Sequence, residues 1–455
     1  MQDNVSAASP APAAPLAPAV ASRSAQAAAL AAERRKLFEH LSSKIPATAL
    51  GLADETLRAQ TEKQIADAMK TLGITLSDSD RPVLTQLVMD ELLGFGPIQP
   101  LLDDPSVTEI MVNRADRVYV ERKGKPFRTD ICFDDDAHLR RVIERIIAPL
   151  GKKVDENNPL VDARLPDGSR VNAVVTPVAV AGACLTIRKF GKARLTLDHL
   201  VEFGSMTPLV AQFLRGCVIA RMNVVVTGGT GSGKTTLLNA LSGCIPEDER
   251  IVTIEDAAEL RLAQDHVITL EARQPDRNGQ GGVSIRELVR NALRMRPERI
   301  VVGECRGGEA LDMLQAMNTG HDGSLTTLHA NSPRDALSRI ETMALMAGID
   351  FPIRVIREQI GSAVQLLVHQ ARLRDGSRKI THIVEVAGME GEKVVLTELF
   401  RWQDEGVGPD GKLKGTLKAS GLRPQFFSKL ESHGLKIPAE TFMPNAPVAR
   451  PAKAA

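Results

Sequence analysis

The residues with the clearest chemical potential form one glycine-rich segment in the second half of the chain. Residues 228–235 read Gly-Gly-Thr-Gly-Ser-Gly-Lys-Thr and lie between the apolar run 224–226 and a helical pattern. Glycines let the backbone curl so that its N–H groups point at phosphate oxygens. In this pattern the lysine neutralises β- and γ-phosphates, and the threonine hydroxyl can ligate Mg²⁺. The segment predicts a site for ATP and Mg²⁺ formed by Gly228, Gly229, Thr230, Gly231, Ser232, Gly233, Lys234, Thr235 and Thr236.

Carboxylates stand at the ends of two further apolar strands, in positions that suit metal binding. Glu304 ends the strand expected at 299–304, and a cluster of acids follows the strand expected at 250–255. An acid beside a phosphate-binding loop can hold Mg²⁺ directly or through water. The candidate metal ligands are Thr235, Asp256 and Glu304. The acids expected to orient the attacking water are Glu304, Glu255 and Glu259.

Each acidic cluster also has a simpler interpretation, which the sequence leaves open. The acids at 255–259 could form an exposed turn that caps a helix. Glu304 could serve only as an ion-pair partner of Arg306.

Two histidines bracket the next apolar run. His321 precedes it and His329 lies at its end. A lone histidine is more often structural than functional. Two of them around one strand of the phosphate-binding region predict phosphate sensing, with His321 as a nucleotide-binding residue and His329 as a catalytic one.

Short apolar strands alternate with helical patterns between residues 195 and 402. Strands are expected at 223–227, 250–255 and 299–304, with helices at 234–241, 285–295 and 309–317. Buried strands that alternate with crossover helices form a parallel sheet. The expected fold class is therefore α/β in this part of the chain.

The rest of the chain predicts smaller parts around this domain. Three amphipathic patterns at 33–95, beginning near Leu30, predict a helical bundle, and the period-two pattern at 96–194 predicts an α+β domain. The Ala/Pro-rich arm at 1–32 is expected to be disordered. Residues 403–455 are expected to form a C-terminal extension with a disordered tail from Thr441.

Composition argues against several classes of protein. The net charge is +1, from 57 basic and 56 acidic residues, and aromatic residues make up 3%, so no nucleic-acid partner is expected. Five cysteines without a C-x-x-C pair disfavour a zinc site and a disulfide framework. No run approaches the roughly 18 apolar residues of a membrane span, so any role at a membrane is expected to come through a protein partner.

The order of the motifs resembles the type II/type IV secretion-system ATPase family. The matching boxes are Walker A at 228–235, the aspartate box at 255–259, an atypical Walker B at 303–304 and the histidine box at 321–329. Further stretches resemble the CpaF-type ATPases of tight-adherence (Tad, type IVc) pili, at 104–113, 162–171, 187–190 and 293–297. The resemblance runs from about residue 84 to 401. The tetracysteine zinc module of some type II secretion members is missing, which disfavours that branch.

This resemblance implies a particular architecture and further site residues. It implies a PAS-like α+β domain at 96–194, a RecA-like P-loop ATPase domain at 195–402 and a ring of six chains, with ATP between the two domains. In this family arginines from outside the P-loop reach the phosphates. The candidates are Arg170 for nucleotide binding, and Arg188, Arg273 and Arg294 for catalysis. Each could instead form an ordinary surface ion pair.

The resemblance also implies a function. The expected protein is a hexameric, ATP-hydrolysing motor that assembles a tight-adherence pilus, with retraction as a further option. It is expected to be cytoplasmic and peripheral to the inner membrane, where it contacts a pilus or secretion platform protein. Three alternatives stay open: a conjugation or effector-secretion ATPase of the same family, an ATP-gated scaffold with little turnover, and a nucleic-acid translocase. The intact Lys234, Thr235 and Glu304 argue against the scaffold.

Overall fold

The computed structural model describes residues 26–27, 29–45, 55–122, 124–190, 194–275, 279–409 and 411–444. Contacts divide the chain into a first unit, Met1–Lys192, and a second unit, Ala193–Ala455. Most of the arm predicted at 1–32 lies outside the described residues, and so does the end of the predicted tail, from residue 445.

The first unit begins with three helices that bury a small apolar core. They are α2 (Ala31–Leu41), α3 (Glu55–Thr71) and α4 (Asp80–Leu93). Leu37, Ile65 and Leu84 are fully buried where the three helices meet. Leu30, which the sequence places in the predicted arm, is only 7% exposed and packs in the same cluster. The ordered part of the bundle therefore starts before the predicted boundary, because an apolar side chain is available to bury there.

A six-stranded antiparallel sheet follows the helices in the same unit. Its strands are β1 (Val107–Arg114), β2 (Arg117–Arg122), β3 (Lys125–Arg128), β4 (Leu160–Arg164), β5 (Arg170–Val174) and β6 (Cys184–Arg188), in the order β3-β2-β1-β6-β5-β4. The accompanying helices are η2 (Gly96–Ile98), α5 (Gln99–Asp103), α6 (Asp136–Ile147) and η3 (Ala148–Leu150). Ile110 of β1 and Leu139 of α6 are fully buried in the shared core. The other face of the sheet carries polar side chains, among them Arg170 and Arg188, which are exposed.

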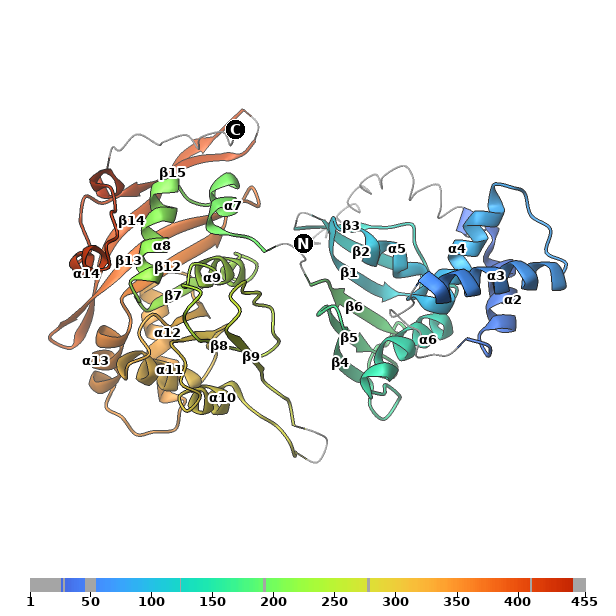
Figure 1. Ribbon diagram of the computed structural model, residues 1–455, viewed down its shortest axis with the longest axis horizontal. Helices are drawn as coiled ribbons and strands as arrows, with labels where there is room; N and C mark the ends of the chain where they lie inside the picture. The colour runs from blue at the N-terminus through green and yellow to red at the C-terminus, as the bar shows by residue number, and fades with distance from the viewer. Residues whose placement is uncertain are drawn as a thin grey trace, which may run out of the picture. The chain divides into compact units, whose positions relative to one another are not determined.

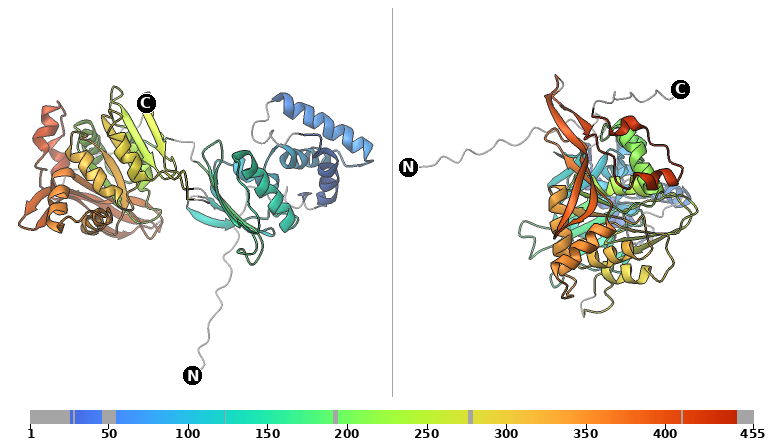
Figure 2. Two further views of the ribbon diagram at one scale, coloured as in Figure 1. Left: turned by 90° about the horizontal axis from the view of Figure 1, so that it is seen from below. Right: turned by 90° about the vertical axis from the view of Figure 1, so that its left-hand side faces the viewer.

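The second unit is built on a nine-stranded sheet with helices on both faces (Figures 1 and 2). Its strands are β7 (Val224–Gly228), β8 (Ile251–Glu255), β9 (Val267–Glu271), β10 (Arg299–Val302), β11 (Leu325–His329), β12 (Leu366–Arg372), β13 (Arg378–Glu390), β14 (Lys393–Val407) and β15 (Leu413–Ala419). The order is β15-β14-β13-β12-β7-β11-β10-β8-β9. Strands from β12 to β9 run parallel, and the pairs from β12 to β15 are antiparallel. The mixed α/β fold expected from the alternating strands and helices is confirmed.

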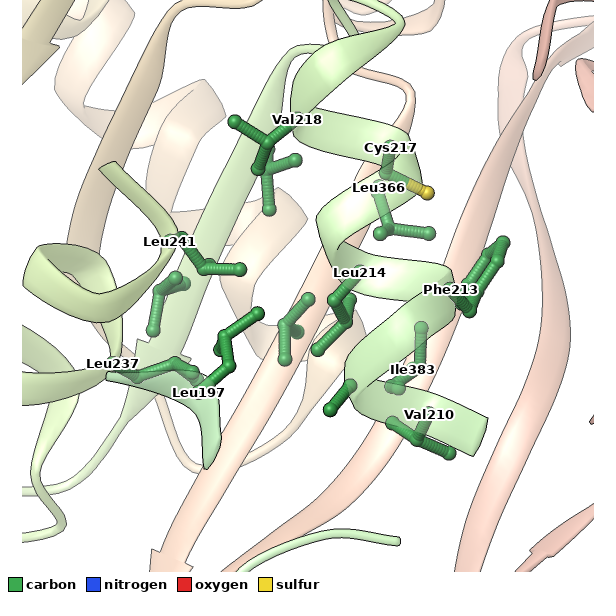
Figure 3. Close-up of a cluster of buried hydrophobic side chains, with 14 of the residues drawn as sticks. Leu197, Val210, Phe213, Leu214, Cys217, Val218, Leu237, Leu241, Leu366 and Ile383 are labelled. Atoms are coloured by element: carbon green, nitrogen blue, oxygen red, sulfur yellow. The ribbon is translucent and has the colours of Figure 1, made fainter. Parts of the chain in front are cut away.

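Successive side chains of β7 enter different cores because a strand alternates its faces. Val224 and Val226 pack in one cluster and Val225 in the other. The helices of the first cluster are α7 (Leu197–Glu202), α8 (Pro208–Ile219) and α9 (Lys234–Ser242). The second cluster contains α10 (Ile285–Ala292), α11 (Glu309–Asn318), α12 (Pro333–Leu345) and α13 (Ile353–Ala363). Figure 3 shows how α8 lays its apolar side chains over the first cluster, including Phe213 and Leu214. The central strand that carries the glycine-rich loop is thus held from both sides.

The C-terminal part of the chain differs from the predicted extension. The predicted boundary at 402 falls inside β14, so the residues that follow continue the same sheet. Beyond it lie α14 (Phe427–Ser432) and η4 (Ala439–Phe442). Phe442 is 3% exposed and contacts the rings of Phe213 and Phe400, so the ordered chain extends past the predicted start of the tail at Thr441. Aromatic packing explains the difference. If these rings separated, a large apolar area that is now buried would be exposed to water.

Two general features complete the description. The five cysteines are unbonded, and Cys217 and Cys305 are buried. Within the described ranges, no helix has both the length and the apolar composition needed to cross a membrane.

Candidate active site

The glycine-rich loop joins the buried end of β7 to the start of α9. Gly228 leaves no room for a side chain, because a Cβ there would lie 2.1 Å from the carbonyl oxygen of Gln370 on β12. Gly231 and Gly233 adopt φ of +70° and +96°, a region that residues with a side chain rarely occupy. The glycines at these positions are therefore required by the backbone path, which brings N–H groups to the first turn of a helix.

Lys234, the first residue of α9, is held inside this loop. Its side chain is buried, and Nζ donates to the carbonyl oxygen of Gly229 at 3.2 Å. The same Nζ lies 3.4 and 3.5 Å from the two ring nitrogens of His329. Burial lowers the pKa of Lys234, and the nearby Glu304 carboxylate partly offsets this effect. The ammonium group is therefore surrounded by the Gly229 carbonyl and the His329 ring, and Glu304 is the nearby group that carries a negative charge.

Glu304 and His329 meet beside the lysine. Oε1 of Glu304 lies 2.7 Å from Nε2 of His329, and Oε2 accepts from Nε of Arg306 at 2.7 Å. Burial, with the positive charge of Lys234, lowers the pKa of His329. Asp256 approaches the same guanidinium, with Oδ2 at 3.3 Å from Nη1 of Arg306. Arg306 therefore pairs with both carboxylates, as the simpler interpretation of Glu304 expects, and the role of Glu304 at a metal ion stays a prediction.

Glu255 has a different environment from the other acids. Its carboxylate is buried and accepts the backbone N–H of Glu259 at 2.9 Å and that of Leu260 at 3.1 Å. A Cβ at Gly303 would lie 2.8 Å from its Cγ, so this glycine makes room for the side chain. Glu255 shapes the loop that carries Asp256 and Glu259, and its oxygens are committed to backbone amides.

Three predicted residues are not brought to the loop within this unit. His321 precedes β11 and Arg294 precedes β10, so both lie at the amino edge of the parallel strands, whereas the P-loop follows a carboxyl end. A five-residue strand separates these edges by roughly 15 Å. Arg273 follows β9, four strands from β7 or roughly 19 Å along the sheet, and its Nε donates to the carbonyl of Gly281.

The two candidate arginines of the first unit are direct neighbours. Arg170 on β5 pairs with Arg188 on β6, and Arg164 on β4 pairs with Arg170. Arg188 also pairs with Glu109 on β1. Burial and the nearby Glu121 carboxylate raise the pKa of Glu109, and the positive charge of Arg188 partly offsets this rise. Like charges placed opposite one another destabilise a sheet. Arg164, Arg170 and Arg188 form an arginine patch on this sheet, with the Glu109 carboxylate beside Arg188.

Other residues near the loop carry no sequence motif. Gln370 and Arg378 lie against it from β12 and β13, and Arg339 of α12 lines a cavity of about 370 Å³ that the loop also borders. Gly229, Thr230 and His329 line the same cavity. Gln370, Arg378 and Arg339 are more than a hundred positions from the P-loop in the sequence, and only the strand order β12-β7-β11 brings them close.

Comparison with known proteins identifies the family. The family described as "Type II/IV secretion system protein" matches residues 91–405. A putative conjugal transfer protein of Mycobacterium tuberculosis is 39% identical over 328 residues, which cover 71% of this chain and 93% of the relative. The type IV secretion system protein VirB11 of Brucella suis is 34% identical, covering 64% and 88%.

Solved structures were compared as well. The crystal structure of the VirB11 ATPase from the Brucella suis type IV secretion system matches with 32% identity and a TM-score of 0.35, covering 63% of this chain and 94% of the other. The pilus retraction motor PilT matches with 19% identity and a TM-score of 0.47, covering 74% and 86%. On the extent of the family match over residues 91–405, the chain belongs to the type II/IV secretion system protein family.

Proposed function

We propose that the second unit hydrolyses ATP and that the energy drives a secretion or pilus apparatus. The observation that carries this proposal is the contact of Lys234 with His329 and of His329 with Glu304 beside the P-loop. A lysine for the phosphates and a side chain that can orient water are recurring parts of sites for phosphoryl transfer, and Lys234 with the His329–Glu304 pair supplies both. Relatives whose names include ATPase support the same activity.

The loop fits a nucleotide phosphate and the residues beside it fit Mg²⁺. Gly228 and Gly233 let the backbone pass close to Gln370 and Arg378, where a side chain would clash, and a loop curled in this way can direct its N–H groups at a phosphate. We infer that Thr235, Glu304 and Asp256 hold Mg²⁺ directly or through water. Mg²⁺ keeps several waters and binds few protein oxygens beside phosphate, so the absence of a three-ligand cluster among the described residues is compatible with it. When bound, the ion neutralises charge that develops during transfer.

The side chains must exchange partners when ATP binds. Lys234 bonds to the Gly229 carbonyl and can turn to the β- and γ-phosphates, where a charge-assisted bond is stronger. His329, in contact with Glu304, lines the cavity that Gly229 and Thr230 of the loop also border, so it would lie near a bound phosphate. Glu304 can then leave Arg306 and orient the attacking water, because its carboxylate already lies at the edge of the site.

The arginine patch of the first unit supports a second part of this proposal. We infer that Arg170 and Arg188 reach the nucleotide, with Arg188 at the γ-phosphate. A guanidinium is always charged and presents a planar set of donors that suits phosphate oxygens. A residue at the γ-phosphate distinguishes ATP from ADP, and this difference in affinity can be converted into motion of one unit relative to the other.

The finer assignment is a tight-adherence pilus motor that acts as a hexamer on an inner-membrane platform protein at the cytoplasmic side. A conjugation or effector-secretion motor is the second candidate, because the relatives include conjugal transfer proteins and VirB11. Deleting the gene in its host separates the two. Loss of surface pili with unchanged conjugation and secretion supports the pilus assignment, and the reverse supports the second candidate.

The activity itself is tested with the purified chain. Phosphate release from ATP should require Mg²⁺, and a chain with Lys234→Ala should release none above background. An active Lys234→Ala protein, or no activity in the native hexamer fraction, contradicts the proposal.

A further inference from the structure

The hairpin between β12 and β13 touches the P-loop from the side opposite His329. Nε of Arg378, the first residue of β13, donates to the carbonyl oxygen of Gly231 at 3.0 Å. Its Cδ lies 3.2 Å from the position of a Cβ at Gly233. Arg378 is exposed, and no carboxylate pairs with its guanidinium in the parts of the chain that the structure describes. The arginine therefore contacts the tip of the phosphate-binding loop and no acidic partner.

The hairpin itself is a rigid support. Leu373 N–H donates to the carbonyl of Ser377 at 2.8 Å, and both the N–H and the hydroxyl of Ser377 bind Asp375 Oδ1. Oδ2 of the same carboxylate accepts the N–H of Leu413 at the start of β15. Hydrogen bonds from Ser377 and from the Leu413 amide lower the pKa of Asp375 to about 2. The carboxylate is thus ionised at neutral pH and fixes the turn that precedes Arg378.

The backbone of Arg378 is anchored at its other end. Its carbonyl accepts the hydroxyl of Ser205 at 2.9 Å, and Ser205 in turn accepts the N–H of Ile380 at 3.0 Å. The backbone of Arg378 is therefore fixed by hydrogen bonds on both sides. This fixes the position from which its side chain extends to Gly231.

The contact constrains the part of the loop that would surround a phosphate. A trans peptide places its C=O and N–H on opposite sides. Holding the Gly231 carbonyl toward the hairpin therefore fixes the direction of the following N–H, that of Ser232, which donates to the carbonyl of Gly229 at 3.3 Å. Gln370 of β12 packs against the same turn. Its Nε2 lies 3.2 Å from the position of a Cβ at Gly233, and the Gln370 residue is only 2% exposed.

We propose that Arg378 is a positioning residue of the nucleotide site, which holds the Gly231 carbonyl so that the P-loop keeps the curled backbone path that a phosphate group needs. This inference rests on the proposed ATP-binding function. Because the contact is with the loop and not with the γ-phosphate, it should affect ADP and ATP alike, unlike a γ-phosphate sensor. The hydrogen bond to Gly231 comes from Nε, so a neutral donor at that position should preserve most of the affinity for ADP and ATP.

Four purified full-length variants test the proposal, and one of them, Arg378→Lys, keeps the charge without the Nε donor. Arg378→Met keeps the length of the side chain and removes the donor, whereas Arg378→Gln places an amide N–H at about the position of Nε without the charge. Arg374→Met is the matched control, because Arg374 lies in the same hairpin and its guanidinium approaches Asp404 at 3.9 Å rather than the P-loop. The measurements are the affinities for ADP and for a non-hydrolysable ATP analogue by calorimetry, kcat and KM, and the melting temperature.

The expected result is a rise in the Kd of Arg378→Met by roughly 5- to 20-fold for both nucleotides, as for loss of one partly exposed, charge-assisted hydrogen bond. Arg378→Gln should restore the affinity to within about 3-fold of the native value, and Arg374→Met should match the native protein. Unchanged ADP affinity in Arg378→Met overturns the proposal, and so does rescue by Arg378→Lys but not by Arg378→Gln, which would show that charge alone matters.

A parallel titration of Lys234→Ala distinguishes the failure of this inference from the failure of the proposed function. If Lys234→Ala loses ADP binding and Arg378→Met keeps it, the nucleotide site stands and Arg378 has no positioning role. If native protein and Lys234→Ala bind ADP equally, the site itself is refuted, and the inference falls with it.

Discussion

Oε1 of Glu304 lies 2.7 Å from Nε2 of His329, so the strand ends of β10 and β11 present one joined acid–imidazole pair to the P-loop. The pair stands next to Lys234, which both supplies positive charge and lowers the pKa of the imidazole. A neutral imidazole can donate to Glu304 without adding a second cation beside the lysine. This arrangement suggests separate roles for the three residues, which substitutions can resolve.

Lys234→Ala should abolish turnover and weaken binding of both ADP and ATP. The reason is that the phosphates lose the one ammonium buried within the loop. Phosphate release and nucleotide titration provide the measurement, and Lys414→Ala, an exposed lysine on β15, is the control. Near-native turnover in Lys234→Ala would remove the P-loop from the mechanism.

Glu304→Gln should bind ATP with nearly native affinity and cleave it on the order of 10²- to 10³-fold more slowly. The amide keeps the shape of the side chain but cannot accept a proton or orient water as a carboxylate does. Single-turnover hydrolysis and analogue binding check this expectation together. The control is Glu358→Gln, whose carboxylate pairs with Arg354 on the surface of α13. A Glu304→Gln protein that neither binds nor cleaves ATP, with a lowered melting temperature, points to a folding role instead.

Arg188→Ala should reduce turnover by roughly 10- to 1000-fold, the range expected for one charge-assisted donor at a phosphoryl site. ADP affinity should fall much less than affinity for an ATP analogue, because only the γ-phosphate contact is lost. Arg117→Ala, on β2 of the same sheet, is the matched control. Equal weakening of both nucleotides, or unchanged turnover, would show that Arg188 is an ordinary strand arginine.

His369 gives a prediction for the pH dependence of stability. Burial, with smaller contributions from His382 and Lys234, lowers the pKa of His369 to about 4. The unfolded chain therefore takes up this proton near pH 6.5 while the folded chain does not. The contribution to the free energy of unfolding is present above pH 6.5 and is lost between about pH 6.5 and 4, by up to roughly 3 kcal/mol.

Denaturant titrations of native protein and His369→Gln across that range measure the effect. The variant should show a shallower fall in unfolding free energy with decreasing pH, whatever its stability at neutral pH. His433→Gln, at an exposed histidine, should keep the native slope. Parallel slopes for native protein and His369→Gln would contradict the assignment.

Arg299 predicts a large change in stability far from the P-loop. It is fully buried, pairs with Glu249 through Nε at 2.5 Å and also donates to the carbonyls of Val218 and Gly323. Arg299→Met removes the buried partner of Glu249 and leaves Arg221, whose Nη2 lies 3.2 Å from Oε2, so we expect a loss of about 3 kcal/mol in unfolding free energy, the low end for a broken buried ion pair. The double variant Arg299→Met/Glu249→Gln should recover part of it. A double variant less stable than Arg299→Met would assign the loss to packing or to the two carbonyls.

The site could be predicted from sequence where a motif follows a strand. The strand expected at 223–227 and the loop after it correspond to β7 and the start of α9, and Glu304 and His329 reach the same edge because both end parallel strands. His321 is the instructive exception. Two histidines that bracket a strand lie at its opposite ends, so only one can face the P-loop of the same chain.

The remaining residues could not be predicted because the order of strands in a sheet has no local sequence signal. Gln370 and Arg378 lie about 140 positions after the loop they contact, and they reach it only because β12 pairs with β7. The boundary at residue 402 was misplaced for a similar reason. The antiparallel strands after β12 lack the helices that mark the preceding α/β pattern, although they continue the same sheet.

The continuation of the sheet through β14 and β15 has a consequence for solubility. A chain that stopped at residue 402 would lose β15 and part of β14, and would leave residues 400–402 of β14 without the β15 residues that pair with them. It would also lose Phe442, which covers Phe213 and Phe400. An open strand edge next to an uncovered aromatic surface is a template for association between chains. We therefore expect the last described residues to limit association between chains, in addition to stabilising the second unit.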